Sequence, residues 1–248
     1  MARTYLVRGM LAGLLAALCA IAFAKALAEP QIGKAEKFEE ALDAQQGKPA
    51  GKPIVSRDVQ DTLGLGVGVA ATGVALGGIF GLAFAGVYRR IGQGGPRATA
   101  LVLALGGFAG VFLVPFLKYP ANPPSVGNPD TIGRRTALYF LAIVVGIIAV
   151  ALAAVLHRQL APRHGSWNAA LLAGAAAVAL VTFAYLVMPG IDEVPAGFPA
   201  SVLWTFRLAS AGTQLLLWGG LGLWFGALTE RAERLVGSLP ARRPALVD

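Results

Sequence analysis

The stretch Thr136–Leu156 reads TALYFLAIVVGIIAVALAAVL and contains no Asp, Glu, Lys or Arg. A helix needs about 20 apolar residues to cross the roughly 30 Å of hydrocarbon in a bilayer. Four more runs lack these charges and are about as long or longer: Thr62–Val87, Ala98–Leu117, Gly165–Ile191 and Leu208–Thr229. Because a soluble domain of 248 residues cannot bury five such helices, the sequence predicts a polytopic membrane protein.

The composition of the whole chain agrees with this prediction. The mean hydropathy is +0.65 and 14% of the residues are charged, compared with about 25% in soluble domains. The apolar runs are rich in Ala, Leu and Gly and lack the alternating pattern of membrane barrel strands. Since backbone groups in lipid must be paired within their own segment, we expect an all-α membrane helix bundle, with residues 1–248 as one membrane domain.

A sixth apolar segment, Leu6–Ala28, stands near the N-terminus. Arg3 and Arg8 precede its apolar core, which starts at Gly9, and its small residues around Ala24 also resemble a signal-peptidase site. We expect six spans if this segment is retained, because Lys25 can reach the headgroups and extend a short apolar core, and five spans if it is cleaved. The single cysteine excludes an internal disulfide and a multi-cysteine metal site.

The charges in the connecting segments predict the orientation. The short segments 88–97 and 157–164 are compact and basic, whereas GIDEVPAGFP at 190–199 has no Lys or Arg. The positive-inside rule therefore places both termini in the cytoplasm, with residues 230–248 as a cytoplasmic tail, in the inner membrane of a bacterium. The basic balance, pI about 10.1, indicates contact with anionic lipid. It does not indicate nucleic acid, because no soluble domain is present to hold it.

Small residues recur at a four-residue spacing along the apolar runs. Gly73, Gly77 and Gly81 form such a series, and three pairs repeat the spacing. The pairs are Gly9 with Gly13, Gly106 with Gly110, and Gly222 with Gly226. This pattern lets helix backbones approach closely in a membrane, so it predicts tight helix packing.

The longest outer segment, residues 29–61, contains a short amphipathic pattern. Ala35, Phe38, Ala41 and Leu42 fall on one helical face, which suits a helix lying on the membrane surface. The neighbouring acids are either a solvated helix face or a carboxylate patch that concentrates divalent cations.

The proline-rich outer loop, residues 118–135, separates two apolar runs. Pro115 and Pro120 are expected to end the preceding helix, and the further prolines keep the loop stiff. The loop is either a rigid turn or a lid over a cavity, with Asn122, Asn128 and Asp130 offering oxygen atoms.

The last outer loop, residues 190–204, begins with the adjacent acids Asp192 and Glu193. Arg207 follows near the start of the last run and needs a carboxylate partner, which Asp192, Glu193 or Asp130 could supply. An ion pair that closes the outer vestibule and a metal site are equally open interpretations. The candidate metal ligands are Glu36, Glu39, Glu40, Asp130, Asp192 and Glu193. The candidate gating or ion-pair residues are Lys118, Arg134, Arg135 and Arg207.

Several motifs are missing from the sequence. The two histidines, His157 and His164, flank arginines in an inner segment, which favours a structural role. There is no P-loop, no Ser/His/Asp set and no acid within the apolar runs. We therefore expect neither an enzyme nor a prosthetic cofactor.

Four stretches together resemble the CbtA family: LVRGMLAGLLA from Leu6, EPQIGKAEKFEEA from Glu29, FLKYPANPPSVGNPDTIGRRTALYF from Phe116, and IDEVPAGFPASVLWTFRLASAGTQ from Ile191. CbtA proteins are regarded as predicted cobalt-transporter subunits associated with cobalamin metabolism. A small one-span partner with a histidine-rich end, CbtB, accompanies them.

The resemblance implies that Co²⁺ is the transported ion and that a CbtB-like subunit is the partner. Family descriptions often give five spans, which fits this chain if the first segment is discounted. The motif positions carried over are Glu29, Glu36, Glu39, Glu40, Lys118, Tyr119, Asn122, Asp130, Arg134, Arg135, Asp192, Glu193 and Arg207. A non-transporting membrane scaffold that binds a partner through its outer loops is the alternative, and a homo-oligomer stays open.

Overall fold

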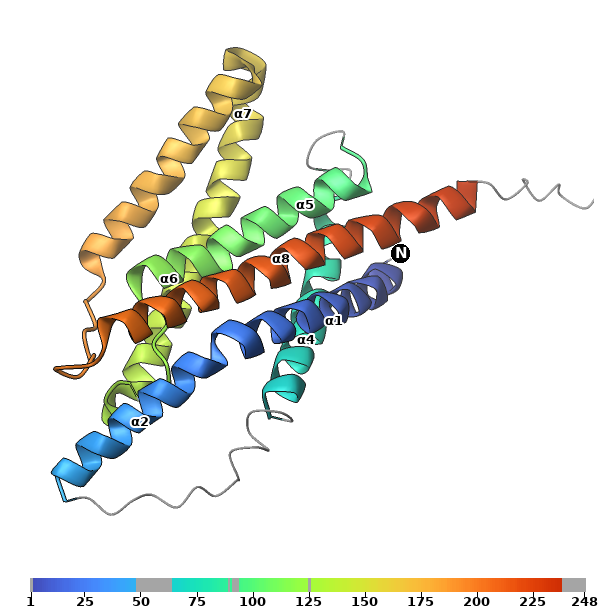
Figure 1. Ribbon diagram of the computed structural model, residues 1–248. Coiled ribbons are helices and arrows are strands. Elements are labelled where there is room, and N and C mark those ends of the chain that lie inside the picture. Colours follow the sequence, from blue (N-terminus) through green and yellow to red (C-terminus); the bar gives the residue numbers. More distant parts are fainter. Residues whose placement is uncertain (1, 48–63, 89, 91–93, 125, 238–248) are drawn as a thin grey trace, which may run out of the picture.

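The computed structural model describes residues 2–47, 64–88, 90, 94–124 and 126–237, and no strand occurs among them. The helical elements are α1 Ala2–Leu27, α2 Glu29–Gln45, α4 Leu65–Val87, α5 Pro96–Gly107, the π-helix η2 Phe108–Leu113, α6 Val114–Lys118, the 3₁₀-helix η3 Pro129–Thr131, α7 Ile132–Val187 and α8 Ala200–Gly237 (Figure 1). The prediction of an all-helical protein is confirmed.

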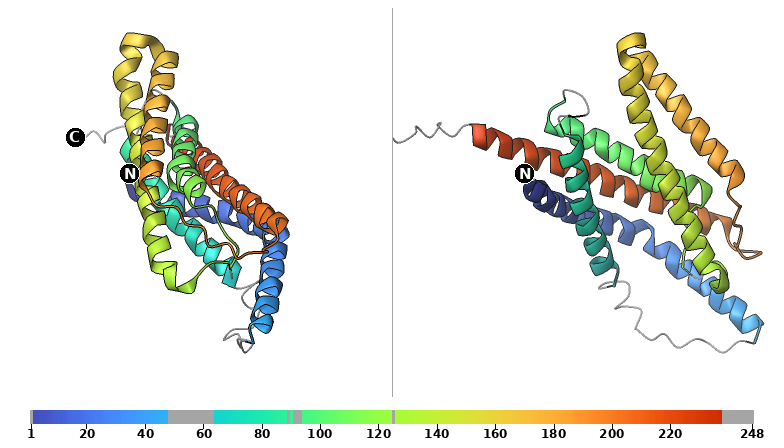
Figure 2. Two further views of the ribbon diagram at one scale, coloured as in Figure 1. Left: turned by 90° about the vertical axis from the view of Figure 1, so that its left-hand side faces the viewer. Right: turned by 180° about the vertical axis from the view of Figure 1, so that it is seen from behind.

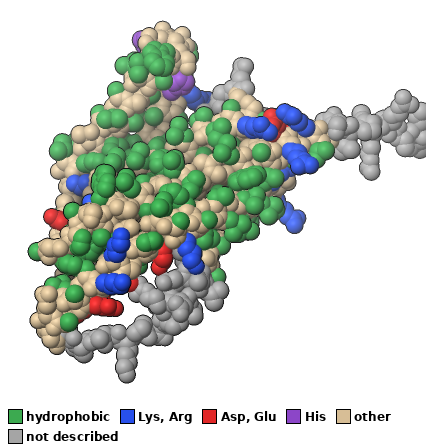
Figure 3. Space-filling view, viewed as in Figure 1, with side chains coloured by type: hydrophobic (Ala, Val, Ile, Leu, Met, Phe, Trp, Pro, Cys, Tyr) green, Lys and Arg blue, Asp and Glu red, His purple; other side chains and the backbone are tan. Residues whose placement is uncertain are grey.

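Four helices of the described chain are long and apolar enough to cross a membrane: Ala2–Leu27, Gly66–Val87, Pro96–Lys118 and Pro129–Val187. Their flanks carry exposed apolar side chains, such as Leu186, which is 81% exposed. Figure 3 shows a broad hydrophobic surface between two ends where charged side chains gather. An exposed apolar surface of this kind is stable in lipid, so these helices fit a membrane protein.

The longest helix, α7, is two arms joined at a sharp bend. Gly165 has φ +76° and ψ 158°, a conformation that favours glycine, and the chain reverses there (Figure 2). The arms correspond to the predicted runs Thr136–Leu156 and Gly165–Ile191. The expected inner loop at 157–164 is instead helical and includes Pro162, so the connection is much tighter than the polar composition indicated.

The third apolar run also differs from the expectation. Pro115 does not end this helix, which continues to Lys118 before the break at Pro120. The π-helix η2 comes directly before, and Pro115 occupies one of the first positions of α6. A missing N–H costs little at such a position, because the first turn of a helix has no partner for it.

The helices are ordered differently in space and in sequence. α1 packs against both α4 and α8, α8 packs against α5, and η2 with α6 packs against α7 (Figure 1). The last helix, α8, therefore lies between α1 and α5. The core they share contains small residues of α1, such as Ala16, and large ones of α4 and α8, such as Phe84 and Leu221, all fully buried.

The glycine spacing marks helix contacts, as predicted. A Cβ on Gly9 would overlap the carbonyl oxygen of Gly77, and a Cβ on Gly13 would overlap that of Gly73. On the other side of the bundle, Gly110 and Gly146 meet in the same way. Backbones this close gain dispersion and weak C–H···O contacts, which are the available attractions between helices in lipid.

The helix α2 continues α1 past Ala28 and does not lie separately across the end of the bundle (Figure 1). Ala35 is 1% exposed and clusters with Val126, Phe198 and Val202. The Phe38 ring meets Phe198 edge-on at 5.1 Å. The predicted apolar face is thus real, but protein covers part of it. Residues 48–61 of the predicted outer segment lie outside the described residues.

Replacing Gly77 by leucine is expected to force α1 and α4 apart. Overpacking of this kind costs about 1–3 kcal/mol, because the obstacle is backbone and not a movable side chain. The measurement is the thermal unfolding midpoint of the purified protein in detergent.

Gly86→Leu on the same helix is the matched control, because a Cβ there meets no heavy atom within 4 Å. Equal midpoints for the two variants would contradict the assigned contact.

Candidate functional site

One end of the bundle carries a cavity of about 900 Å³, called here the polar cavity. Three segments far apart in the sequence converge on it: α2, the proline loop with the start of α7, and residues 191–195, with Arg207 of α8 beside them. Its charged lining residues are Glu39, Asp43, Arg135, Asp192, Glu193 and Arg207. Aromatic side chains and prolines make up much of the remaining wall.

The proline loop is held to the end of α7 at its first residues. Lys118 Nζ donates a hydrogen bond to the Tyr185 carbonyl oxygen at 2.7 Å, and the Tyr185 hydroxyl donates to the Val114 carbonyl. Tyr119 Oη donates to the Pro189 carbonyl oxygen at 2.8 Å. Burial raises the pKa of the Tyr119 hydroxyl and Arg134 opposes this, so the donated proton is retained at neutral pH.

Arg207 holds the middle of the same loop. Its Nε donates to the Ala121 carbonyl oxygen at 3.2 Å and its Nη2 donates to Asn122 Oδ1 at 2.9 Å. The Asp192 carboxylate is close enough to favour the charged guanidinium. The direct partners of Arg207 are therefore neutral oxygens of the loop, and only one of the three expected acids contributes, at longer range.

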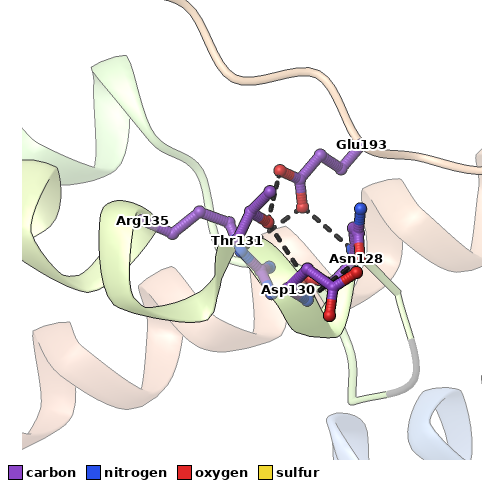
Figure 4. Close-up of polar contacts among 5 residues, drawn as sticks. All are labelled: Asn128, Asp130, Thr131, Arg135 and Glu193. Carbon is purple, nitrogen blue, oxygen red and sulfur yellow. Dashed lines mark hydrogen bonds and ion pairs between the residues drawn. The ribbon is translucent and has the colours of Figure 1, made fainter.

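Glu193 forms the centre of a polar cluster with Asn128, Thr131 and Arg135, called here the Glu193 cluster (Figure 4). Thr131 Oγ1 donates to Glu193 Oε1 at 2.6 Å and the Asn128 backbone N–H donates to Oε2 at 2.9 Å. Arg135 Nε lies 3.3 Å from Oε2. The hydrogen bond from Thr131, followed by that from Asn128 and the charge of Arg135, lowers the pKa of Glu193.

The Asn128 side chain also shapes the chain around it. Its Oδ1 accepts from the Asp130 backbone N–H at 3.0 Å, and its carbonyl oxygen accepts from Arg135 Nη2 and lies 2.9 Å from Thr131 Oγ1. Asn128 therefore caps the short helix η3 that leads into α7. The Asp130 carboxylate is exposed and turned away from Glu193 in Figure 4.

The structure brings part of the predicted site together. Glu39, Asp192 and Glu193 line the polar cavity with Arg135 and Arg207. Five predicted residues do not line it, namely Glu36, Glu40, Asp130, Lys118 and Arg134. Arg135 pairs with Glu193.

Nowhere in the described ranges do three or more His, Cys, Asp or Glu side chains form a group that could hold a metal ion. The carboxylates at the polar cavity are separate, and Glu193 already accepts two hydrogen bonds and an ion pair. The assignment of the six predicted acids as metal ligands stays a prediction.

Two groups of lining residues were not singled out from the sequence. Thr136 and Tyr139 stand on the face of α7 that carries Ile132 and Arg135, at the three- and four-residue spacing of one helix side. The helical spacing from Arg135 is the sequence signal that could have identified these two residues. Asp43 on α2 also lines the cavity.

The apolar helices fit a multi-pass membrane protein that carries a polar cavity at one end of its bundle. The chain belongs to the CbtA family, described as a probable cobalt transporter subunit, whose family model matches residues 2–230. No curated protein and no solved structure matches the chain significantly.

Replacing Glu193 by alanine is expected to release the proline loop from residues 191–195. The readout is hydrogen exchange of the Asn128 amide, whose N–H donates to Glu193. At neutral pH the variant should exchange faster than the wild type. Because the pKa of Glu193 is lowered in the folded protein, its stabilising contribution is complete above the ordinary glutamate pKa and disappears as the pH falls through the lowered value.

The exchange rates of the Asn128 amide in the wild type and in Glu193→Ala should therefore become equal in acid. Asp192→Asn is the reference at each pH. A difference between wild type and Glu193→Ala that persists unchanged in acid would contradict the assigned role of the carboxylate.

Proposed function

We propose that this protein is the membrane-embedded subunit that takes up Co²⁺, or a divalent ion of similar chemistry, across the bacterial inner membrane for cobalamin supply. The chain's membership of a family of probable cobalt transporter subunits supports transport. The observation that carries the proposal is the convergence of three acid-bearing segments on one cavity at the end of the bundle that the charge pattern places outside.

The charges of the polar cavity suit a weak first capture of a cation. Glu193 is neutralised by Arg135, and Asp192 partly by Arg207. Glu39 and Asp192 are exposed at the cavity, so their charges remain accessible to an ion. Four acids and two arginines line the polar cavity, so its net charge is negative and raises the local concentration of cations without holding them tightly. Weak capture is what a transport site requires, because the ion must leave again.

The remaining parts of the proposal concern the assembly. The chain crosses the membrane six times with both termini inside, counting α1, α4, the α5–α6 helix, the two arms of α7, and α8. A CbtB-like one-span subunit completes the transporter, and the arginines at the other end of the bundle contact anionic lipid. The ion passes the proline loop and crosses between the glycine-faced helices.

A non-transporting scaffold is the second candidate, and the fixation of the outer loops by Arg207 and Glu193 favours it. A rigid, proline-rich surface at the end of a bundle also suits a protein partner. Uptake measurements separate the two functions.

Cells without other cobalt transporters are expected to accumulate ⁵⁷Co²⁺ when they express this chain together with its partner subunit. The double variant Glu39→Gln/Asp192→Asn should raise the half-saturating Co²⁺ concentration roughly fivefold, because it removes the accessible charges of the polar cavity. The matched control is Glu40→Gln, since Glu40 is exposed on α2 but does not line the cavity.

If cells that express both subunits gain no ⁵⁷Co²⁺ uptake, the transport proposal is wrong and the scaffold function is favoured. The amount of protein in the membrane is measured for every variant.

Orientation is tested with single cysteines in a Cys19→Ser background. Pro124→Cys lies on the exposed proline loop and should react with an impermeant maleimide in intact cells. Arg163→Cys lies near the bend of α7 and should react only after the membrane is opened. The reverse pattern would place the polar cavity in the cytoplasm and contradict uptake by this route.

A further inference from the structure

We propose that the polar cavity binds the metal ion as a complex with a small carboxylate-bearing organic ligand, and not as a bare or simply hydrated ion. The inference rests on the proposed transport of a divalent ion and specifies the chemical form of the substrate. Size, supply of donor atoms and chemistry of the wall each support it.

The polar cavity has room for a ligand larger than a hydrated ion. Water occupies about 30 Å³ per molecule, so an ion with six waters fills roughly 200 Å³. The cavity measures about 900 Å³. This lies within the range of about 300–1,000 Å³ that is usual for sites that bind small organic molecules.

The donor atoms of the chain do not replace the shell of a bare ion. A first-row divalent ion that gives up its ligands needs several nitrogen, oxygen or sulfur donors at one point. Across the part of the chain that the structure describes, no three His, Cys, Asp or Glu side chains provide such a point. Glu193 is committed to Thr131, Asn128 and Arg135. The described residues of the cavity therefore favour an ion that keeps the ligands with which it arrives.

The wall of the polar cavity suits a carbon skeleton. The lining includes Phe38 and Leu42 of α2. It also includes Tyr119 and Val126 of the proline loop and Tyr139 of α7. Prolines of the loop add further apolar surface. Apolar surface interrupted by a few charged groups is typical of sites for small organic molecules.

Arg207 supplies the group that recognises a carboxylate. A guanidinium has five N–H donors, and the loop oxygens of Ala121 and Asn122 receive bonds from Nε and Nη2. The loop thus uses two of the N–H donors of Arg207. The other N–H donors belong to the same side chain, which lines the cavity. Charge-assisted bonds from arginine to carboxylate are strong and directional, and they bind the ligand of the complex and not the metal.

The test uses the full chain purified with its co-expressed partner subunit. Equilibrium dialysis is carried out with ⁵⁷Co²⁺ alone, and with ⁵⁷Co²⁺ plus either [¹⁴C]citrate or [¹⁴C]histidine at the same free Co²⁺ concentration. We expect ⁵⁷Co and ¹⁴C to be retained together at about one to one with at least one of the two ligands. Retention of ⁵⁷Co without either ligand should be at least tenfold weaker.

Two variants locate the complex. Arg207→Gln should weaken retention of both labels about tenfold or more, as expected for a lost charge-assisted hydrogen bond, and Arg134→Gln should not, because Arg134 is exposed outside the cavity. Since Arg207 also holds the proline loop, Thr136→Trp is the second variant. It fills the cavity from α7 without touching the loop contacts, and it should exclude the complex in the same way.

Equal retention of ⁵⁷Co with and without the organic ligands, with no ¹⁴C bound, would overturn this inference and leave the proposed uptake of the ion intact. Retention of neither label also overturns it. Uptake by cells then decides the function separately, because failure of the proposed function requires that cells accumulate no ⁵⁷Co in any form.

Discussion

The direct backbone contact between α1 and α4 sets the position of most other parts of the molecule. Gly9, Gly13, Gly73 and Gly77 leave no side chain between the two helices, so α1 is fixed against α4 along much of its length. A neighbouring strip of α1 presents Ala16 to Gly220 of α8. Because α2 continues α1, the same contact determines where the acids of α2 stand relative to α8 and the outer loops.

The charged groups at the polar cavity divide into two kinds. Arg207, Arg135 and Glu193 connect chain segments that lie more than 50 residues apart, through loop carbonyls, an amide, a hydroxyl and the ion pair between Arg135 and Glu193. Glu39 and Asp192 are exposed and have no such role in the geometry described above. A residue type alone does not distinguish these groups. Glutamate is a residue type that often binds metals, but the hydrogen-bond partners of Glu193 are those of a structural residue.

The charge-free runs were sufficient to predict the helices, because the requirement for backbone pairing in lipid leaves few alternatives. The glycine spacing also predicted contact surfaces, but not which surfaces meet, since Gly110 has its partner at Gly146 and Gly222 has its partner at Ala104. Predictions from single residues failed where an adjacent element changed the local backbone conformation. Pro115 was expected to end a helix, but η2 directly before it places this proline in a first turn, where it is tolerated.

The site was predictable as a set of segments and not as a set of contacts. The acids and prolines of residues 29–45, 118–135 and 190–204 mark outer segments by composition, and all three meet at one cavity. The pairing of Glu193 with Thr131 joins residues 62 positions apart, and that of Arg207 with Asn122 joins residues 85 positions apart. Such pairs depend on how the arms of α7 and the start of α8 pack, which short-range patterns do not contain.

The two sides of the polar cavity are held by different forces, and this difference has consequences for how the cavity responds to its surroundings. The proline loop is held by hydrogen bonds of Lys118, Tyr119 and Arg207, by Val126 in the apolar cluster, and by the Glu193 cluster. Of these contacts, those of the Glu193 cluster depend on the protonation of Glu193. The helix α2 is bound through Ala35 and Phe38 against Phe198 and its neighbours, by apolar contact that is insensitive to pH. Acid therefore loosens the loop side of the cavity and leaves the α2 side in place, so that the carboxylate-bearing helix remains a fixed wall while the opposite wall gains freedom.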